Sequence, residues 1–213
     1  MLDDPQELVQ RVEVGRRLFA GACTFVRGCV RLDDLPVPDR AEVAFVGRSN
    51  VGKSSLVNGL TGRRALAKVS NTPGRTQQLN YFDLGGLMYL VDLPGYGFAK
   101  APKSAVETWT RLMKSFLRGR VPLRRVYLLI DSRHGIKPVD QDMLGMLTAA
   151  GVSSLLVLTK ADKIKAEAAT AVLDATQRGI KRYAAVHPEP LLTSSETGVG
   201  IELLRADVAR FLD

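Results

Sequence analysis

Gly47 and Gly52, followed directly by Lys53 and Ser54, form a pattern that suits the binding of a phosphorylated ligand. Glycine permits backbone conformations that a side chain would block, so amide N–H groups can converge on an anion. Lys53 would bring a positive charge to the β- and γ-phosphates of a nucleotide, and the Ser54 hydroxyl would coordinate Mg²⁺. The predicted phosphate-binding loop consists of Gly47, Arg48, Ser49, Asn50, Val51, Gly52, Lys53 and Ser54.

The sequence on both sides of this loop has the character that the pattern requires. An apolar run at 43–46 indicates a buried strand before the loop, and residues 54–60 indicate a helix after it. Such a helix directs the positive end of its dipole at the bound phosphates. The alternative is a glycine-containing turn between an ordinary strand and an ordinary helix.

A second candidate turn, Asp92-Leu93-Pro94-Gly95, follows the apolar run at 87–91. A carboxylate in this position can hold Mg²⁺, usually through water, and the Gly95 amide can meet a γ-phosphate. The same tetrapeptide is also common turn chemistry. Its place after a strand and downstream of the phosphate-binding loop favours the interpretation as a magnesium and phosphate site.

A third turn, Thr159-Lys160-Ala161-Asp162, follows the apolar run at 155–158 and suits the recognition of a base. The Asp162 carboxylate can accept two hydrogen bonds from the N1–H and exocyclic amine of guanine, whereas adenine presents the opposite pattern. The aliphatic stem of Lys160 can lie over the base plane. A surface salt bridge at a helix start explains Asp162 equally well at this point.

Two further segments could complete a nucleotide site. Backbone amides of Thr193-Ser194-Ser195, after the run at 191–192, could contact the guanine oxygen, although ordinary turn residues are the simpler interpretation. Residues 63–78 have no periodicity, and a threonine there could coordinate Mg²⁺ only when the γ-phosphate is present. Thr76 is the candidate for that role and Thr72 is its rival.

Apolar runs alternate with segments of helical periodicity, which predicts a doubly wound α/β fold. In such sheets ligands bind beyond the carboxyl ends of the strands, which is where the polar turns occur. Gly85-Gly86 indicates a hairpin, and therefore one antiparallel strand in an otherwise parallel sheet of six strands with helices on both faces. The expected strands are 43–46, 79–84, 87–93, 126–130, 155–158 and 191–193, and the expected helices are 5–18, 54–61, 104–117, 139–150, 163–184 and 200–212. Residues 1–40 are expected to form an N-terminal extension packed on a domain of residues 41–213.

The composition is that of an ordinary globular protein, with 46% apolar and 24% charged residues among 213. No apolar run reaches the roughly 18 residues of a membrane span, and the chain starts with acidic residues, so we expect a cytoplasmic protein that does not enter a membrane. Cys23 and Cys29 suit reduced thiols better than a disulfide framework. The net charge of +8 favours phosphate-rich partners such as nucleic acid, but solubility alone explains it equally well.

The motifs resemble, in order and approximate spacing, the five guanine-nucleotide motifs of translation-factor-related P-loop GTPases, the class that includes the TrmE, Era, EngA, EngB and septin-like proteins. More narrowly, they resemble the EngB (YihA/YsxC) family of bacterial GTPases. The strings that carry this resemblance are Gly-Arg-Ser-Asn-Val-Gly-Lys-Ser-Ser-Leu-Val-Asn, Asn-Thr-Pro-Gly-Arg-Thr-Gln, Asp-Leu-Pro-Gly-Tyr-Gly-Phe-Ala and Asp-Ser-Arg-His-Gly, which begin at Gly47, Asn71, Asp92 and Asp131. The resemblance extends from about Phe25 to the end of the chain.

The resemblance implies a Ras-like GTPase that acts as a switch in assembly of the large ribosomal subunit and is needed for normal cell division and septation. It implies Mg²⁺ as cofactor, with Ser54 and Thr76 as its ligands and Lys53 and Thr76 as the catalytic pair. Ribosomal RNA and proteins would be the partners of a monomer. A further segment would contact GTP or GDP in addition to the other motifs; it consists of Gly74, Arg75, Thr76, Gln77 and Gln78.

Two residues determine what we expect of the reaction rate. Ras-like enzymes orient the attacking water with a glutamine directly after Asp-x-x-Gly, and Tyr96 occupies that position here, which predicts slow intrinsic hydrolysis. Asn50 resembles the asparagine of potassium-activated GTPases, so K⁺ stimulation is a further hypothesis.

Asp131 and Arg133 are interpreted as structural residues that cap the following loop. An ATP-dependent small-molecule kinase and a nucleotide-binding module with little turnover are the rival functions.

Overall fold

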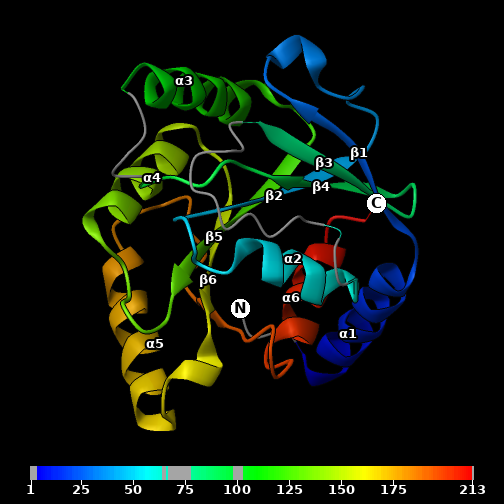
Figure 1. The fold of residues 1–213 in the computed structure, drawn as a ribbon. Helices are drawn as coiled ribbons and strands as arrows, with labels where there is room; N and C mark the ends of the chain where they lie inside the picture. Colours follow the sequence, from blue (N-terminus) through cyan, green and yellow to red (C-terminus); the bar gives the residue numbers. More distant parts are fainter. Residues whose placement is uncertain (1–3, 64–65, 67–77, 98–102, 213) are drawn as a thin grey trace.

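The computed structural model describes residues 4–63, 66, 78–97 and 103–212. This described part is built around a seven-stranded sheet in the order β1-β3-β4-β2-β5-β6-β7 (Figure 1). Its strands are β1 (Cys23–Cys29), β2 (Ala41–Gly47), β3 (Leu79–Leu84), β4 (Met88–Asp92), β5 (Leu123–Asp131), β6 (Ser154–Thr159) and β7 (Leu191–Leu192). Strands β4, β2, β5, β6 and β7 are parallel to one another, and β3 runs antiparallel to both β1 and β4. The predicted α/β class with one antiparallel strand is confirmed.

The sheet has one strand more than the six that the sequence predicts. Strand β1 pairs with β3 from Cys23↔Leu84 to Cys29↔Leu79, so part of the N-terminal segment extends the sheet at its edge. Its two cysteines are buried and free, but Phe25 and Val26 between them are exposed. An edge strand with exposed apolar residues shows neither the unbroken run of a buried strand nor a clean alternation, which is why the sequence did not reveal it.

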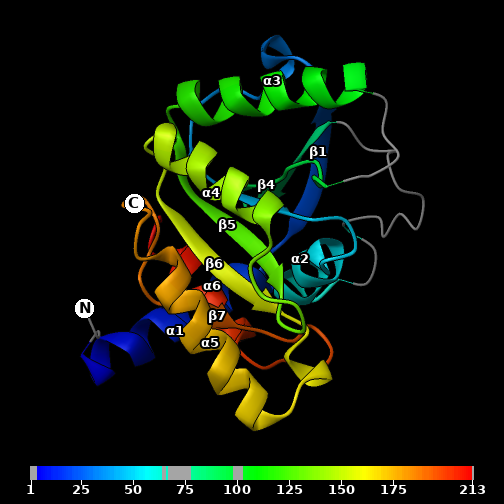
Figure 2. The ribbon, with the colours of Figure 1, turned by 90° about the vertical axis from the view of Figure 1, so that its left-hand side faces the viewer.

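Helices cover both faces of the sheet and give the three predicted layers (Figures 1 and 2). They are α1 (Pro5–Ala20), α2 (Lys53–Thr61), α3 (Lys103–Gly119), α4 (Pro138–Ala149), α5 (Ala166–Ile180) and α6 (Ile201–Ala209). Apolar residues of α1, α2 and α6 share one core cluster, and those of α3, α4 and α5 share the cluster on the opposite face. None of the helices in the described ranges is long and apolar enough to cross a bilayer.

The ends of several helices follow local chemistry. Asp4 caps α1 by accepting a hydrogen bond from the Gln6 amide at 3.1 Å, and Gly62 ends α2 in the left-handed conformation with φ of 64°. The predicted helix 163–184 was too long at both ends. A 3-10 turn at Ala161–Lys163 comes first, α5 itself begins at Ala166, and it stops at Ile180, where the amide of Tyr183 turns back to the Ile180 carbonyl at 2.9 Å.

A buried ion pair connects the start of β2 to the residue that follows α3. Glu42 is fully buried, and Arg120 donates to both of its carboxylate oxygens, with Nε at 3.0 Å from each. The Tyr81 hydroxyl of β3 donates to the same carboxylate at 3.2 Å. Because a buried carboxylate is costly unless it is paired and hydrogen-bonded, this arrangement fixes the strand that leads into the phosphate-binding loop.

Candidate nucleotide-binding site

The predicted phosphate-binding loop joins β2 to α2 at the carboxyl end of the sheet. Gly52 is the N-cap of α2 and has φ of 101°, a conformation that favours glycine. A Cβ atom on Gly47 would lie 2.8 Å from Val51 Cγ1 and 2.9 Å from the Leu129 carbonyl oxygen of β5, so any side chain would force the backbone apart. The two glycines are therefore required by a backbone turn and by close packing on the neighbouring strand.

The positive charge of the loop is paired with the carboxylate that follows β4. Lys53 Nζ contacts Asp92 Oδ1, and the two side chains are only 14% and 12% exposed. The register of the parallel strands, with Phe45 opposite Asp92, brings the end of β4 level with the end of β2, after which the loop that carries Lys53 begins. A phosphate group that binds Lys53 would have to compete with this carboxylate.

The turn Asp92–Gly95 lies directly against the phosphate-binding loop. The Ser49 amide donates to the Tyr96 carbonyl, and the Tyr96 amide donates to the Gly47 carbonyl, both at 3.3 Å. A Cβ atom on Gly95 would be 3.3 Å from Ser49 Oγ. Ser49 Oγ is buried and has no hydrogen-bond partner among the described residues, so an unused polar atom lies where the two loops meet.

The side chain of Tyr96 is bound to α4. Its side chain is buried, and its hydroxyl donates to Asp140 Oδ1 of α4 at 2.7 Å. Burial, together with the Asp140 carboxylate, raises the pKa of Tyr96 far above its ordinary value. Arg48 Nε lies 3.3 Å from the same carboxylate oxygen. The hydroxyl is therefore engaged with α4, at the same carboxylate oxygen that lies close to Arg48 of the phosphate-binding loop.

Asp140 is the residue of this region that the sequence analysis missed. It is fully buried, and its second carboxylate oxygen accepts from the Lys137 amide at 2.8 Å. The sequence did contain a signal, because Asp140 shares one face of its helix with Met143, Leu144 and Leu147, which are all buried. A carboxylate on an otherwise apolar helical face indicates a buried partner.

The turn after β6 is tied to the phosphate-binding loop by two side chains. Thr159 Oγ1 donates to the Val51 carbonyl at 2.6 Å, and Lys160 Nζ donates to the Asn50 carbonyl at 2.6 Å. Lys160 itself has a left-handed backbone with φ of 61°. This arrangement joins the predicted base-recognition turn to the predicted phosphate loop as one unit.

Asp131, at the end of β5, does more than cap its loop. Its carboxylate accepts from the Arg133 amide at 3.1 Å, as the capping interpretation expects, and also from Lys160 Nζ at 2.9 Å. Burial alone would raise the pKa of Asp131, but the hydrogen bonds from Arg133 and Lys160 hold it well below its usual range. A charged Asp131 therefore faces Lys160 at neutral pH.

The side chain of Asp162 is oriented by the loop that follows β7. Its Oδ1 accepts from Ser194 Oγ at 2.7 Å, and its Oδ2 lies 3.0 Å from Lys163 Nζ. The Ser194 hydroxyl, and after it Lys163, lowers the pKa of this carboxyl. The backbone adds a bond from the Ala161 amide to the Thr193 carbonyl at 3.0 Å. Each carboxylate oxygen still has accepting capacity for a ligand.

Ser194 also has a turn role, as local sequence chemistry favoured. Its Oγ accepts from the amides of Glu196 and Thr197 at 3.2 Å, and its own amide donates to the Val199 carbonyl at 2.9 Å. The Ser194 amide is thus engaged within the protein. Ser195 is exposed next to it, and its amide is the better placed of the two for a ligand.

The remaining predicted site residues lie apart from these contacts or outside the described residues. The side chain of Gln78 packs against Gly28 of β1 and donates to Asn80 Oδ1 at 2.9 Å. Gly74, Arg75, Thr76 and Gln77, and the rival Thr72, lie outside the described residues.

The donors present fit a magnesium ion that is shared with a phosphate ligand. Ser54, in the first turn of α2, offers a half-buried hydroxyl, and Asp92 offers a carboxylate; both are hard oxygen donors. Within the described ranges, no three His, Cys, Asp or Glu residues cluster in a way that could hold a metal. Mg²⁺ suits such a sparse site because it keeps several waters and takes further ligands from phosphates.

The phosphate-binding loop, the acidic turn after β4 and the turns after β6 and β7 meet at the carboxyl ends of parallel strands. This fold and site define a P-loop nucleotide-binding protein. The model of the 50S ribosome-binding GTPase family matches residues 42–160. The chain is 58% identical over 211 residues to the probable GTP-binding protein EngB of Rhodospirillum rubrum, with 97% of this chain and 91% of the relative covered.

A second relative and a solved structure agree with this match. The probable GTP-binding protein EngB of Cereibacter sphaeroides is 56% identical over 197 residues, which cover 92% of this chain and 91% of the relative. A crystal structure of a probable GTP-binding protein EngB aligns with a TM-score of 0.64 at 23% identity, over 81% of this chain and 98% of that one, and so shares the fold. The chain belongs to the EngB family of GTP-binding proteins, within the 50S ribosome-binding GTPases, and the predicted enzyme class, a GTPase, is confirmed.

Proposed function

We propose that this GTPase binds Mg²⁺ and GTP, hydrolyses GTP slowly, and acts as a nucleotide-dependent switch in assembly of the large ribosomal subunit. The protein would act as a monomer in the bacterial cytoplasm and be needed for normal cell division and septation. Residues 41–213 would form the G domain and residues 1–40 its N-terminal extension. The observation that carries the nucleotide assignment is the direct link of Thr159 and Lys160 to the carbonyls of Val51 and Asn50.

On the phosphate side, Lys53 would leave its contact with Asp92 and bind the β- and γ-phosphates. Bound Mg²⁺ would neutralise charge that develops on the transferred phosphoryl group. Ser54 and Thr76 would hold the ion, and Asp92 would reach it through water. The other phosphate contacts would come from backbone amides of the phosphate-binding loop, from Gly95 and from residues 74–78.

On the base side, Asp162 would accept hydrogen bonds from the N1–H and exocyclic amine of guanine. Its orientation by Ser194 and its lowered pKa support this role, because both favour a fixed, charged acceptor. The stem of Lys160 would cover the base plane, and the amide of Ser195 would contact the guanine oxygen.

The burial of Tyr96 supports slow intrinsic hydrolysis. Its hydroxyl is bound to Asp140, so this residue does not orient an attacking water from the position where Ras-like enzymes carry a glutamine. We expect the ribosomal particle to accelerate the reaction. Potassium is a second candidate activator, because the exposed Asn50 lies in the phosphate-binding loop. Equal turnover in KCl and NaCl would remove the potassium hypothesis.

The buried Tyr96 also favours one alternative, a nucleotide-binding interaction module with little turnover. Phosphate release with and without purified large-subunit particles separates the two. We expect a slow basal rate that rises at least tenfold with particles; no phosphate release under either condition would support the alternative. Displacement of labelled GTP by GDP but not by ATP is expected, and equal displacement by ATP would contradict guanine recognition.

A further inference from the structure

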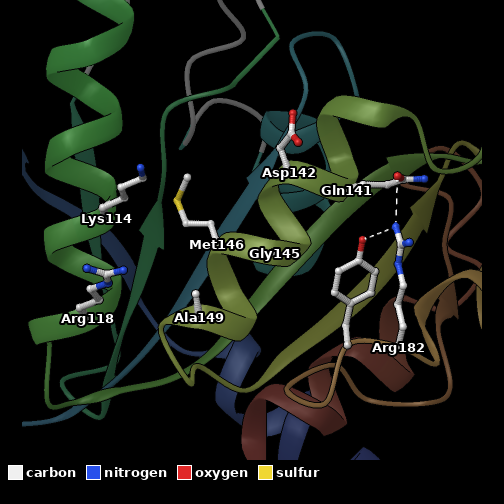
Figure 3. Close-up of a pocket in the computed structure, with 9 residues that line it drawn as sticks. Lys114, Arg118, Gln141, Asp142, Gly145, Met146, Ala149 and Arg182 are labelled. Atoms are coloured by element: carbon white, nitrogen blue, oxygen red, sulfur yellow. Dashed lines mark hydrogen bonds between the residues drawn. The ribbon is translucent and has the colours of Figure 1, made fainter.

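A groove separate from the nucleotide site runs over α4, on the sheet face opposite α2 and α6. Its volume is about 590 Å³. One wall is formed by Lys114 and Arg118 of α3, the floor by α4, and the other wall by the segment after α5, where Arg182 lies (Figure 3). The groove therefore draws its lining from three elements that are distant in sequence.

Small residues of α4 keep the groove open. Gly145 and Ala149 are four residues apart and so lie on the same face of the helix, next to Met146 (Figure 3). A Cβ atom on Gly145 would meet no other atom within 4 Å. Among the described residues nothing outside the helix backbone crowds this position, so a methyl group at Gly145 would displace no neighbour.

The two walls carry positive charges that form no ion pair within the described part of the chain. None of the ion pairs among the described residues includes Lys114, Arg118 or Arg182. Arg182 is held in place by neutral partners, with Nη2 at 3.2 Å from Gln141 Oε1 and the guanidinium 4.9 Å from the Tyr183 ring centroid (Figure 3). Asp142 is the one carboxylate among the residues that line the groove.

We propose that this groove binds the phosphodiester backbone of an RNA strand. The three cations are exposed and come from opposite walls, so they suit an extended polyanion better than a small anion, which would need a closed pocket. The Tyr183 ring and Met146 supply apolar surface beside the charges, on which a base or ribose can pack. The net charge of +8 agrees with a nucleic-acid partner.

The groove also has a direct connection to the nucleotide site. Asp140, which binds Tyr96 and Arg48, lies in the first turn of α4 and immediately precedes Gln141 of the groove. The helix that forms the floor of the groove is therefore anchored to the phosphate-binding loop. This inference rests on the proposed ribosomal function for its partner, but the groove and its charges are independent of that function.

The test is the affinity of the full-length protein, with GDP bound, for a fluorescein-labelled 20-nucleotide oligo(U) RNA. The variant with Lys114→Ala, Arg118→Ala and Arg182→Ala is compared with a control of equal charge loss, carrying Arg27→Ala, Arg124→Ala and Lys165→Ala elsewhere on the surface. We expect the groove variant to bind at least tenfold more weakly and its slope of log K against log[KCl] to fall by about 2. The control should change less than threefold, and equal losses in both would overturn the proposal.

A second pair of variants tests the groove without removing any cation. Gly145→Glu places a carboxylate in the open space, whereas Gly145→Ala adds only a methyl group. We expect the glutamate variant to lose RNA affinity at least fivefold while the alanine variant binds as wild type, with GDP affinity unchanged in both. Equal RNA binding by the two variants would overturn the proposal.

Two further measurements separate the partner classes and the two proposals. Displacement of the RNA by poly-L-glutamate at equal charge concentration would overturn RNA as the ligand in favour of an acidic protein, and failure to displace supports RNA. If wild type binds large-subunit particles and the groove variants bind them equally well, the groove inference fails while the ribosomal function stands. If wild type binds no particles but groove-dependent RNA binding remains, the ribosomal function fails and the groove stands.

Discussion

The nucleotide site and the groove over α4 are both rich in positive charge, but they differ in whether the cations are paired with carboxylates. In the described part of the nucleotide site, three cations have a carboxylate partner: Lys53 has Asp92, Lys160 has Asp131, and Arg48 has Asp140. In the groove, Lys114, Arg118 and Arg182 have none among the described residues. Paired cations are held at fixed positions where geometry matters, whereas unpaired surface cations remain available to a polyanion.

Removing the charge of Asp140 should have the largest effect on stability. The carboxylate is fully buried, accepts hydrogen bonds from the Tyr96 hydroxyl and the Lys137 amide, and forms an ion pair with Arg48. We expect Asp140→Asn to lower the free energy of unfolding by about 3 kcal/mol, because it leaves Arg48 without its partner and weakens two hydrogen bonds. Equilibrium unfolding in urea measures this change in the free energy of unfolding.

Tyr96→Phe is the matched control for this prediction. It removes only the hydroxyl that donates to Asp140, so we expect a loss of about 1 kcal/mol. The hydrolysis rate should stay within twofold, because the hydroxyl is engaged with Asp140 of α4. A large fall in that rate would contradict the assignment of Tyr96 to the α4 contact alone.

Asp131→Asn should weaken nucleotide binding by a smaller amount. The loss of charge leaves Lys160 held by the Asn50 carbonyl alone, so the base-recognition turn is less well fixed. We expect the Kd for GTP and for GDP to rise about tenfold, or about 1.4 kcal/mol, with kcat within twofold. Calorimetry gives the Kd values for GTP and for GDP. The control is Arg133→Ala, which removes the exposed partner of Asp131 and should change these Kd values less than threefold. A fall in kcat with unchanged Kd would refute this positioning role.

The same carboxylate predicts how stability depends on pH. The folded-state pKa of Asp131 lies below its value in the unfolded chain, because Arg133 and Lys160 together outweigh burial. Its contribution is therefore complete above about pH 4, the ordinary aspartate pKa, and is lost as pH falls further towards the folded-state value. We expect Asp131→Asn to flatten the acid limb of the stability curve below about pH 4 in urea titrations. An identical acid limb in wild type and variant would show that Asp131 is not charged in the fold.

Gly145→Ala should have the smallest effect and the opposite sign. The added methyl group meets no neighbour, and alanine is favoured over glycine within a helix, so we expect a gain of about 0.5–1 kcal/mol. Thermal unfolding should show a rise in Tm of a few degrees, with nucleotide affinity unchanged. A loss of stability would mean that the floor of the groove is covered by protein in solution.

Much of the fold could be predicted because its central strands are buried. Unbroken apolar runs identified β2, β4, β5 and β6, and Gly85-Gly86 identified the hairpin between β3 and β4. The edge strand β1 was missed because most of its residues are exposed. The end of α5 at Ile180 was missed because helical periodicity continues beyond the point where the backbone turns.

The loops of the site could be predicted, but their mutual contacts could not. Glycine spacing and acidic residues after strands identified the segments that meet. The contact of Lys160 with Asn50 and Asp131 depends on β5 lying between β2 and β6, an order that local sequence does not encode. Asp140 was overlooked for the same reason, since its partners Tyr96 and Arg48 are far away in the chain.

The choice of base by Asp162 is tested most directly by calorimetric titration of Asp162→Asn with GTP and with xanthosine triphosphate. The Ser194 hydroxyl can still donate to the amide oxygen of the new side chain, so the loop should keep its shape. We predict that GTP affinity falls at least 100-fold and that xanthosine triphosphate, whose C2 carbonyl accepts from the new amide, becomes the preferred ligand. Retention of the wild-type preference for GTP would contradict the assignment of Asp162 as the residue that selects guanine.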